Sequence, residues 1–404
     1  MQNTVHTIFF AGQRQDGSAY GWQSGHPDDD LVRVGPGTLC GEYMRRYWQP
    51  FAQSKDLTTT PKNLRILGEE LVMFRDGQGR AGVLTPRCIH RGTSLFYGKV
   101  DDHGIRCCYH GWQFDVGGRC IDQPAEPAGS TFKDRVRQPW YPVEERYGLA
   151  FIYMGPLNKR PLLPMWDILE NPSADQMVAA IGPSGIGVGG DETVTSVPWS
   201  WFQDYENTMD PFHVPILHAS FTEVHFDPRM AIMPQVTYNL TDVGLNYSAY
   251  RKLDDGREMD RVSPCMLPNV RSVPDVRLQA GNATRIGWVV PMDDTSHLLF
   301  HAFLTPKDNP GWVRGRIQDW GGMSDEERQR LPGDWEAQLG QGAITRHSEE
   351  HLGASDKGII MLRKLLKKQM QIVRDGGDPM GLVYDPAKVV LTTGSGNYYR
   401  ETAG

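Results

Sequence analysis

Two short cysteine–histidine motifs constrain this chain more than any other feature of its sequence. Cys88 and His90 are separated by one residue, and further on Cys107 and His110 are separated by two. Thiolates and neutral imidazoles are ligands for iron and zinc. A glycine follows each histidine closely, where the backbone must fold tightly. The motifs therefore predict a metal site built by two loops, each of which supplies one cysteine and one histidine.

Three kinds of site use cysteines and histidines in such an arrangement. In a Rieske [2Fe–2S] cluster two imidazoles replace two thiolates on one iron, which raises the reduction potential. A structural Cys₂His₂ zinc site needs the same ligand types, and a disulfide between Cys107 and Cys108 is a third alternative. The first motif has an unusual spacing for zinc, and a disulfide between sequence neighbours is strained, so the cluster is favoured. Cys108 is a rival of Cys107 as ligand, but the two-residue spacing to His110 favours Cys107.

A second group of metal-ligand residue types occurs in the run ENTMDPFHVPILH. Asn207, Asp210 and His213 are each three apart, which places them along one face of a helix. His213 and His218 are five apart and converge only where the helix widens locally; Pro215 loosens that turn because it has no N–H to donate. Two neutral histidines plus a carboxylate form the ligand set of O₂-activating Fe(II). The competing interpretation makes Asp210 a helix N-cap before a proline, and each histidine a core residue.

The length of 404 residues predicts two or three domains. From about residue 48 to about residue 157, short β-like runs alternate with Gly, Pro and Asp turns, which predicts a small antiparallel β domain. Prolines at 161, 164 and 172 indicate a boundary after it. Beyond the boundary the pattern is mixed. We expect helices at residues 38–48, 202–219, 334–352 and 355–375, with Ser355 as the last N-cap, and strands at 193–197, 236–250 and 286–291.

Composition and charge do not favour a nucleic-acid or membrane partner. The formal net charge is −7, and no apolar run approaches the roughly 18 residues that span a bilayer, so we expect a cytoplasmic protein. A G-x-G-x-x-G pattern occupies residues 185–190, but β-like residues ending in Pro198 follow it. A dinucleotide site needs a helix there, because the phosphate binds at the helix N-terminus. We therefore expect the nicotinamide site to lie on a separate reductase.

The cysteine–histidine motifs, CIHRG at residues 88–92 and CCYHGW at residues 107–112, resemble the two loops of the Rieske domain in ring-hydroxylating oxygenases. The stretch from VGPG at residues 34–37 to RRYWQP at residues 45–50 is similar to the N-terminal segment of phthalate-dioxygenase-type large (alpha) subunits. The resemblance covers nearly the whole chain and is thin between residues 225 and 330.

This resemblance implies an α+β fold. An all-β Rieske [2Fe–2S] domain precedes a catalytic domain of antiparallel sheet and helices, of the helix-grip or START-like kind. The implied segments are residues 1–43 (N-terminal arm and helix), 44–160 (Rieske domain) and 161–404 (catalytic domain with mononuclear iron).

The resemblance also assigns roles to individual residues. The implied ligands are Cys88, His90, Cys107 and His110 for the cluster, and His213, His218 and Asp334 for Fe(II). Asp356 is the rival of Asp334, although its place at a helix start suits it to the helix N-terminus instead. Asn207 and Asp210 are implied to be catalytic-site residues. In a head-to-tail homotrimer, Asp210 accepts hydrogen bonds from His213 and from His110 of the partner subunit, and so bridges two metal centres.

The implied function is that of an oxygenase component. A separate NAD(P)H-dependent flavin or iron–sulfur reductase supplies electrons, with or without a ferredoxin, and O₂ is activated at Fe(II) to hydroxylate or dihydroxylate a small aromatic substrate. O- or N-demethylation uses the same iron ligands and is the alternative activity; an electron carrier without mononuclear iron is a further one. We expect an aromatic carboxylate as substrate. Candidate carboxylate-binding residues, each of which is also typical of a protein surface, are Arg251, Arg261, Arg271, Arg277 and Arg285.

Overall fold

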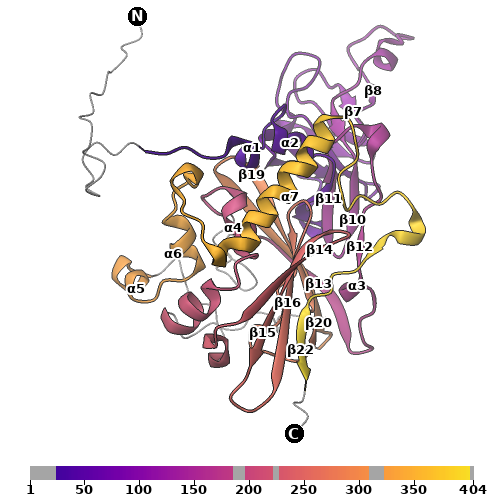
Figure 1. The fold of residues 1–404 in the computed structure, drawn as a ribbon. Coiled ribbons are helices and arrows are strands. Elements are labelled where there is room, and N and C mark those ends of the chain that lie inside the picture. The colour runs from indigo at the N-terminus through magenta and orange to yellow at the C-terminus, as the bar shows by residue number, and fades with distance from the viewer. Residues whose placement is uncertain (1–23, 185–195, 222–226, 309–322, 401–404) are drawn as a thin grey trace, which may run out of the picture.

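The computed structural model describes residues 24–184, 196–221, 227–308 and 323–400, and it confirms the predicted α+β fold class. Figure 1 shows a group of small sheets from the N-terminal half of the chain above one large sheet, across which the long helix α7 runs. The N-terminal arm up to residue 23 and the glycine pattern at residues 185–190 lie outside the described residues.

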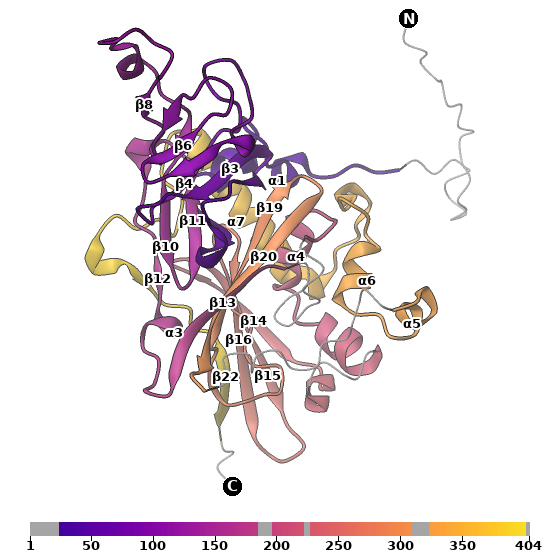
Figure 2. The same ribbon diagram turned by 180° about the vertical axis from the view of Figure 1, so that it is seen from behind.

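Three small antiparallel sheets form the N-terminal half of the described chain, as its alternation of short β-like runs and turn residues predicts. Their strand orders are β1-β11-β10, β2-β3-β4-β9 and β5-β6-β7-β8. The strands are β1 (Trp48–Gln53), β2 (Lys62–Ile66), β3 (Glu69–Arg75), β4 (Ala81–Leu84), β5 (Lys99–Asp101), β6 (Gly104–Arg106), β7 (Gln113–Phe114), β8 (Cys120–Asp122), β9 (Trp140–Tyr141), β10 (Val143–Arg146) and β11 (Leu149–Tyr153). Figure 2 shows the sheets that contain β3, β4, β6 and β8 projecting from one end of the large sheet.

The large sheet of the C-terminal half has the order β13-β20-β19-β17-β16-β15-β14, with β22 pairing to β16 and β18 to β22. Its pairs are antiparallel, and the separate pair β12–β21 is parallel. The strands are β12 (Met165–Trp166), β13 (Gln176–Ser184), β14 (Gln235–Thr241), β15 (Gly244–Lys252), β16 (Glu258–Met266), β17 (Val270–Arg271), β18 (Gly281–Asn282), β19 (Arg285–Asp293), β20 (Ser296–Pro306), β21 (Val390–Leu391) and β22 (Gly396–Arg400).

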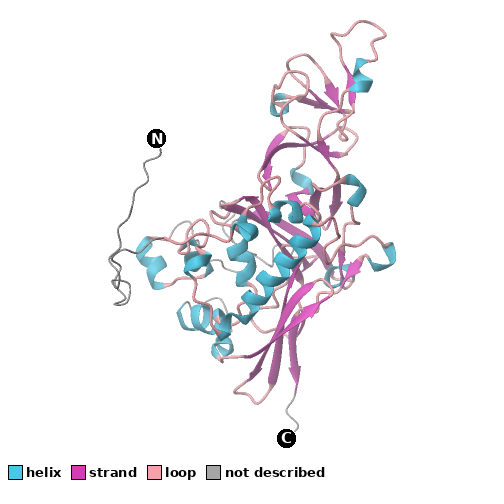
Figure 3. Cartoon of the chain, turned by 45° about the horizontal axis from the view of Figure 1, so that its top comes forward, coloured by secondary structure: helices cyan, strands magenta, loops and turns pink. Residues whose placement is uncertain are grey.

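Helices lie mainly on one face of this sheet, as Figure 3 shows by colour. Helix α4 contacts β19, and α7 contacts α2, α4 and β15. No described helix is both long and apolar enough to cross a membrane. The helices are α1 (Asp29–Val32), α2 (Leu39–Met44), α3 (Asp167–Glu170), α4 (Trp201–Asn207), the π-helix η6 (Val214–Phe221), α5 (Asp325–Arg330), α6 (Asp334–Leu339) and α7 (Lys357–Arg374), with 3₁₀ turns at η2 (Ser54–Asp56), η3 (Leu95–Tyr97), η4 (Phe132–Arg135), η5 (Leu157–Lys159), η7 (Pro228–Ala231), η8 (His347–Glu349), η9 (Ala354–Asp356) and η10 (Pro386–Lys388).

Several predicted boundaries are wrong. The expected helix at residues 334–352 ends at Leu339, because Gly340 and Gly342 follow and Gly342 has a φ of +87° that favours a turn. The expected strand at residues 236–250 is a hairpin of β14 and β15 that turns at residues 242–243. The expected helix at residues 38–48 ends at Met44, before β1 begins. Of the expected strands, that at residues 286–291 is confirmed within β19, and that at residues 193–197 lies largely outside the described residues.

The start of α7 also differs from the prediction. The helix begins at Lys357, so that Asp356 and not Ser355 occupies the N-cap position. The Asp356 carboxylate accepts a hydrogen bond from the Gly353 N–H at 2.6 Å, which ties it to the preceding 3₁₀ turn. The amphipathic pattern nevertheless predicts the helix itself, since Leu362, Leu365, Leu366 and Met370 are buried.

The buried apolar residues form a large core that joins the two halves, and a small separate core at the far end of the N-terminal half. The large core runs from Leu31 to Met370 and includes β1, β11, β19 and α7. Strand β1 contacts β13 and β19, and α4 also contacts β19. The small core contains Phe74, Ile105 and Phe114 together with Cys88 and Cys107. It therefore supports the two predicted metal-binding loops. The predicted segments 1–43, 44–160 and 161–404 stay predictions.

Candidate metal centres

The two cysteine–histidine motifs lie on loops with matching backbone hydrogen bonds. In the first loop, after β4, the Cys88 N–H donates to Thr93 O at 2.9 Å and the Gly92 N–H donates to Cys88 O at 2.8 Å. The second loop, between β6 and β7, repeats both bonds around Cys107, at 2.8 and 3.1 Å. Gly92 and Gly111 close the loops with φ of +78° and +74°, values that side chains other than glycine rarely adopt.

The side chains of these loops separate into an inner and an outer pair. The thiols of Cys88 and Cys107 are buried, at 2% and 4% exposed. The imidazole rings of His90 and His110 are partly exposed and lie 4.6 Å apart, and His90 stacks on Trp112 at 4.3 Å. A [2Fe–2S] cluster fits this order, because one iron takes two thiolates and the other two imidazoles.

The rival ligand Cys108 is exposed, whereas Cys107 is buried beside Cys88. Burial, followed by the charge of Cys107, raises the pKa of the Cys88 thiol to about 11. Iron that binds here must therefore displace a proton. The position of Cys107 agrees with its predicted role, and Cys108 has no place in the inner pair.

The second predicted group also comes together. A ligand atom from each of His213, His218 and Asp334 lies within 4.8 Å of the other two. The Nε2 atoms of both histidines face the carboxylate, at 3.7 Å for His213 and 3.2 Å for His218. His218 is buried and Asp334 half-exposed, so the group opens to one side. Two imidazoles and one carboxylate on one side of an ion form the facial ligand set of non-haem Fe(II).

The expected helix at residues 202–219 is two segments separated by a turn that contains Asp210, so Asn207, Asp210 and His213 do not lie along one helix as expected, but the second segment widens as predicted. Helix α4 ends at Asn207, and after a turn the chain continues as the π-helix η6 from Val214. Pro215 lies in the first turn of η6, where its carbonyl accepts a hydrogen bond from the Ser220 hydroxyl at 2.8 Å. A π-turn has more residues per turn than an α-helix, which lets side chains five apart lie on one face. The predicted local widening of the helix at Pro215, which lets His213 and His218 converge, is therefore confirmed.

Asn207 supports the carboxylate of this triad. Its side-chain amide donates to Asp334 Oδ1 at 3.1 Å, while His218 faces Oδ2. Asp334 is the first residue of α6 and follows the N-cap Gly333, so it is placed by a helix start far along the chain. The rival Asp356 is absent from the triad. Asn207 thus acts on the site through Asp334, as a positioning residue.

The triad is electrostatically suited to a cation. Burial alone would raise the pKa of Asp334, but His218 and then His213 lower it well below its usual range. Burial opposes the charged form of His213, yet Asp210 and Asp334 raise its pKa above the usual value. The Asp334 carboxylate is therefore ionised among imidazole nitrogens, in the protonation state that metal binding needs.

The predicted contact of Asp210 requires correction. His213 Nδ1 lies 2.6 Å from the main-chain carbonyl of Asp210, whereas the Asp210 carboxylate is 3.6 Å from that nitrogen. The carboxylate instead accepts from the backbone N–H groups of Phe212 and His213, at 2.9 and 3.3 Å. The reason is the tight turn after α4, which aims the carbonyl at the ring. The Asp210 side chain therefore caps the helical turn that follows it, as in the alternative interpretation of Asp210 as a helix N-cap. Its role as a bridge between two metal centres stays a prediction.

A buried charge group that the sequence analysis missed fixes α4 to the sheet. Asp204 pairs with Arg271 of β17 at 2.5 Å and with His297 Nε2 of β20 at 3.1 Å. Burial would raise the pKa of Asp204, but Arg271 and then His297 lower it to about 2. The signal was present in the run WFQDYEN, in which acidic residues interrupt a helix of large aromatic residues. Charges in such a helix are buried only when they are paired.

Replacing Asp204 with asparagine is expected to lower the free energy of unfolding by about 3 kcal/mol, because Arg271 is left buried without a counter-charge. The folded pKa lies below the ordinary 3.8, so this stabilisation is present above about pH 4 and is lost as the pH falls toward about 2. Urea denaturation at pH 7 measures the change. The control is Asp255→Asn, which breaks an exposed pair with Arg257 and is expected to cost less than about 0.5 kcal/mol. Equal losses of stability in the two variants would contradict the role of Asp204 in fixing α4 to the sheet.

Comparisons with known proteins agree with this geometry. Residues 47–139 match the family model of the Rieske [2Fe–2S] domain. The chain is 46% identical over 395 residues to the phenoxybenzoate dioxygenase subunit alpha of Ectopseudomonas oleovorans, with 97% of each protein covered. The chain belongs to the Rieske oxygenase large subunits. It is also 33% identical to the 5,5'-dehydrodivanillate O-demethylase oxygenase subunit of Sphingobium sp., over 90% of this chain and 84% of that protein.

Solved structures show the same fold at lower identity. The Pseudomonas putida CBB5 NdmA QL mutant with theobromine aligns with a TM-score of 0.60 and 20% identity, over 83% of this chain and 93% of that one. As a Rieske oxygenase large subunit, this chain is an enzyme component that works with a separate reductase, and its cofactors are a Rieske [2Fe–2S] cluster and mononuclear iron. The alternatives of a structural zinc site and of a carrier without mononuclear iron are therefore excluded.

Proposed function

We propose that this Rieske oxygenase oxidises a small aromatic carboxylate. The observation that carries the proposal is the convergence of two histidines and a carboxylate beside an amide, within an oxygenase family. Relatives are named for phenoxybenzoate, 3-chlorobenzoate and phthalate, each of which is an aromatic carboxylate. The demethylase alternative is kept, because a relative is named as an O-demethylase and the same ligand set serves that reaction.

The ligand assignments are part of the proposal. Bound iron of the mononuclear site supplies O₂ activation beside the substrate. We assign the [2Fe–2S] cluster to Cys88, His90, Cys107 and His110, and the mononuclear iron to His213, His218 and Asp334. The inner and outer pairs of the cluster loops support the first set, and the 4.8 Å grouping supports the second.

The surrounding residues orient these ligands. The carbonyl of Asp210 accepts from the Nδ1–H of His213, which fixes the tautomer that leaves Nε2 free to bind metal. Asn207 holds one carboxylate oxygen of Asp334. Such partners of metal ligands typically change metal affinity by about 10- to 100-fold. They keep the site ready before substrate enters.

Electrons are proposed to cross between subunits of a homotrimer. Figures 1 and 2 place the region of β7 and β8, beside the cluster loops, well away from α6, whose first residue is Asp334. The surface around the loops is apolar and aromatic, which supports docking of another protein. Its exposed residues are Ile89, Phe96, Tyr97, Tyr109 and Phe132. We further propose an NAD(P)H-dependent flavin or iron–sulfur reductase, with or without a ferredoxin, as redox partner, and a cytoplasmic location.

The first test of the proposal is metal analysis followed by turnover. Protein purified without oxygen is expected to contain about three iron and about two labile sulfide per chain. With a reductase and NADH, it should oxidise at least one member of a panel of benzoates, phthalates and aryl ethers. High-performance liquid chromatography separates ring hydroxylation from loss of a methyl group. Full metal content without oxidation of any aromatic compound would contradict the proposed function.

A further inference from the structure

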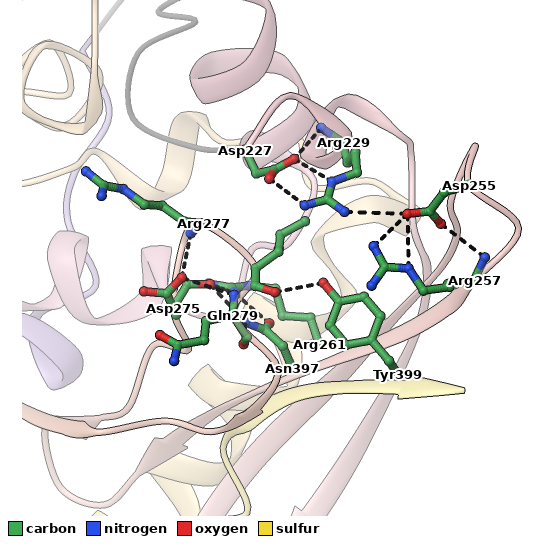
Figure 4. A network of polar contacts seen from close by, with 11 residues as sticks. Asp227, Arg229, Asp255, Arg257, Arg261, Asp275, Arg277, Gln279, Asn397 and Tyr399 are labelled. Carbon is green, nitrogen blue, oxygen red and sulfur yellow. Dashed lines mark hydrogen bonds and ion pairs between the residues drawn. The ribbon is translucent and has the colours of Figure 1, made fainter. Parts of the chain in front are cut away.

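The structure separates the five candidate arginines by their partners. Figure 4 shows that Arg261 donates to backbone carbonyls, and the bonds are 2.9 Å to both Asp275 O and Pro274 O, with a third of 2.8 Å to Asn397 Oδ1. Its hydrogen-bonding capacity is therefore largely used within the protein. Arg277 is exposed at the surface end of the same network. Neither residue is suited to hold a buried substrate.

Two further arginines are set aside for different reasons, one for its ion pair and the other for its position in the sheet. Arg271 pairs with Asp204, so its charge is already balanced. Arg251 is buried, and its Nε–H donates to Ile232 O at 2.8 Å, while its Nη1 has no hydrogen-bond partner among the described residues. It lies on β15, four strands from β20 in the strand order of the sheet.

Arg285 differs from the other four. Within the described parts of the chain, its guanidinium forms no hydrogen bond or ion pair. Burial, followed by the charges of Arg271 and Arg261, lowers the pKa of Arg285 to about 10. A guanidinium remains protonated in proteins, so Arg285 carries a positive charge at a half-buried position where no carboxylate among the described residues pairs with it.

Strand register places Arg285 on the same face as Arg271. Arg271 of β17 pairs with Gly287 of β19, and Gly287 pairs with His301 of β20. Alternate residues of a strand share a face, so Arg285 and Gly287 face the same side. Arg271 reaches Asp204 of α4 from this side. Arg285 therefore faces the side of the sheet on which α4 lies, and α4 carries Asn207, whose amide donates to the ligand Asp334.

A second polar group on this face also lacks a partner. His301 is 4% exposed and its Nδ1 has no hydrogen-bond partner among the described residues. Burial, followed by the charges of Arg285 and Arg271, holds the pKa of His301 well below its usual range. Its ring is therefore neutral and can donate one hydrogen bond without adding charge.

Gly287 keeps space beside these groups. A Cβ at this position would lie 2.9 Å from His301 Cδ2 and 3.6 Å from Arg271 Cγ. The absence of a side chain lets the imidazole lie against the strand. Charge interactions also link Arg285 to Arg271 and Arg271 to Asp334. The unpaired groups thus belong to the same interior as the iron triad.

We propose that Arg285 and His301 bind the carboxylate of the aromatic substrate. The guanidinium has five N–H donors in a planar fork, which matches two carboxylate oxygens, and a neutral imidazole supplies a further donor. An anion there also balances the positive charge that Arg285 places inside the protein. This inference rests on the proposed function and adds the group that selects acids over neutral aromatic molecules.

The test compares Arg285→Gln with Arg277→Gln, which removes the same charge from the surface. Benzoate, phthalate and 3-phenoxybenzoate are titrated calorimetrically into oxygen-free holoenzyme, beside benzamide, phthalamide and 3-phenoxybenzamide. The wild type and Arg277→Gln are expected to bind at least one acid more tightly than its amide. In Arg285→Gln, affinity for that acid falls about a hundredfold and affinity for the amide is unchanged. Turnover should show the loss in KM rather than in kcat.

Arg285→Lys provides a second variant if the glutamine protein does not fold. Lysine keeps the charge but loses the planar fork, so binding of the acid is expected to weaken about tenfold. Unchanged acid affinity in both folded variants would overturn the inference, as would a wild type that binds no acid better than its amide. If the wild type then still oxidises 3-phenoxytoluene, the proposed oxygenase function stands without this site. If fully metallated protein oxidises no aromatic compound, the proposed function itself fails.

Discussion

Asp334→Ala is expected to reduce product formation by about a thousandfold or more, because the mononuclear iron contributes several kcal/mol to catalysis and this change removes a ligand. The cluster loops belong to a separate core, so the visible absorption of the [2Fe–2S] cluster should be unchanged. Iron content is expected to fall from about three to about two per chain, while labile sulfide stays at about two. Metal analysis and turnover on the same preparation check both results.

Two matched variants separate ligation from other roles of acidic and polar residues. Asp356→Ala removes the rival carboxylate, which bonds to Gly353 N and lies outside the triad, and it should retain full iron and full activity. Asn207→Ala leaves the three ligands but removes a hydrogen bond to Asp334, so iron affinity should fall about 10- to 100-fold. An active Asp334→Ala protein with full iron content would transfer the ligand role to another residue. An inactive, iron-deficient Asp356→Ala protein would identify that residue.

The sequence predicted the metal-binding loops because their determinants are local. Ligand spacing and closing glycines occupy a few consecutive positions, and the structure shows the same backbone bonds around Cys88 and Cys107. The widening of the helix near Pro215 was equally local, since a proline removes one donor at a known position. Asp334 could be placed only through the family resemblance, because the fold brings it to His213 and His218 from far along the chain.

Other features could not be obtained from local patterns. Helix α6 ends at Leu339 although the expected helix continued to residue 352, since glycines outweigh an otherwise helical composition there. Which of the candidate arginines has partners within the protein depends on residues of other strands that are distant in sequence, such as Asn397 for Arg261. Whether Asp210 presents its carbonyl or its carboxylate to His213 depends on a turn geometry that composition does not specify. These are consequences of tertiary structure.

Asp210→Asn is expected to abolish product formation while leaving both metals and the oligomer intact. Asparagine keeps the side-chain oxygen that caps Phe212 and His213, so stability should change by less than about 0.5 kcal/mol. It removes the negative charge and replaces the second acceptor oxygen with an NH₂ donor. Burial opposes the charge of Asp210, but His213 and the backbone N–H groups lower the pKa of this carboxyl. The variant therefore tests the charge of the carboxylate separately from its capping role.

The physical reason for the expected loss is the proposed position of Asp210 between two metal centres. Its carboxylate lies 3.6 Å from His213 Nδ1, is partly exposed, and can accept a hydrogen bond from His110 of the partner subunit. Electron transfer weakens steeply with distance, so a missing bridge slows transfer between the imidazoles on either side. Rapid mixing of pre-reduced protein with substrate and O₂ should show a cluster that stays reduced in Asp210→Asn and reoxidises in the wild type.

Asp210→Ala completes the comparison, since it removes both the charge and the cap. If the carboxylate carries the electron path, the asparagine and alanine proteins should be equally slow in cluster reoxidation, and only alanine should lose about 1 kcal/mol of stability. If Asp210 is merely a helix cap, the asparagine protein should reoxidise its cluster at the wild-type rate, and alanine should show a stability loss alone. A fully active wild-type monomer would also remove the bridging role, because the path then lies within a single chain.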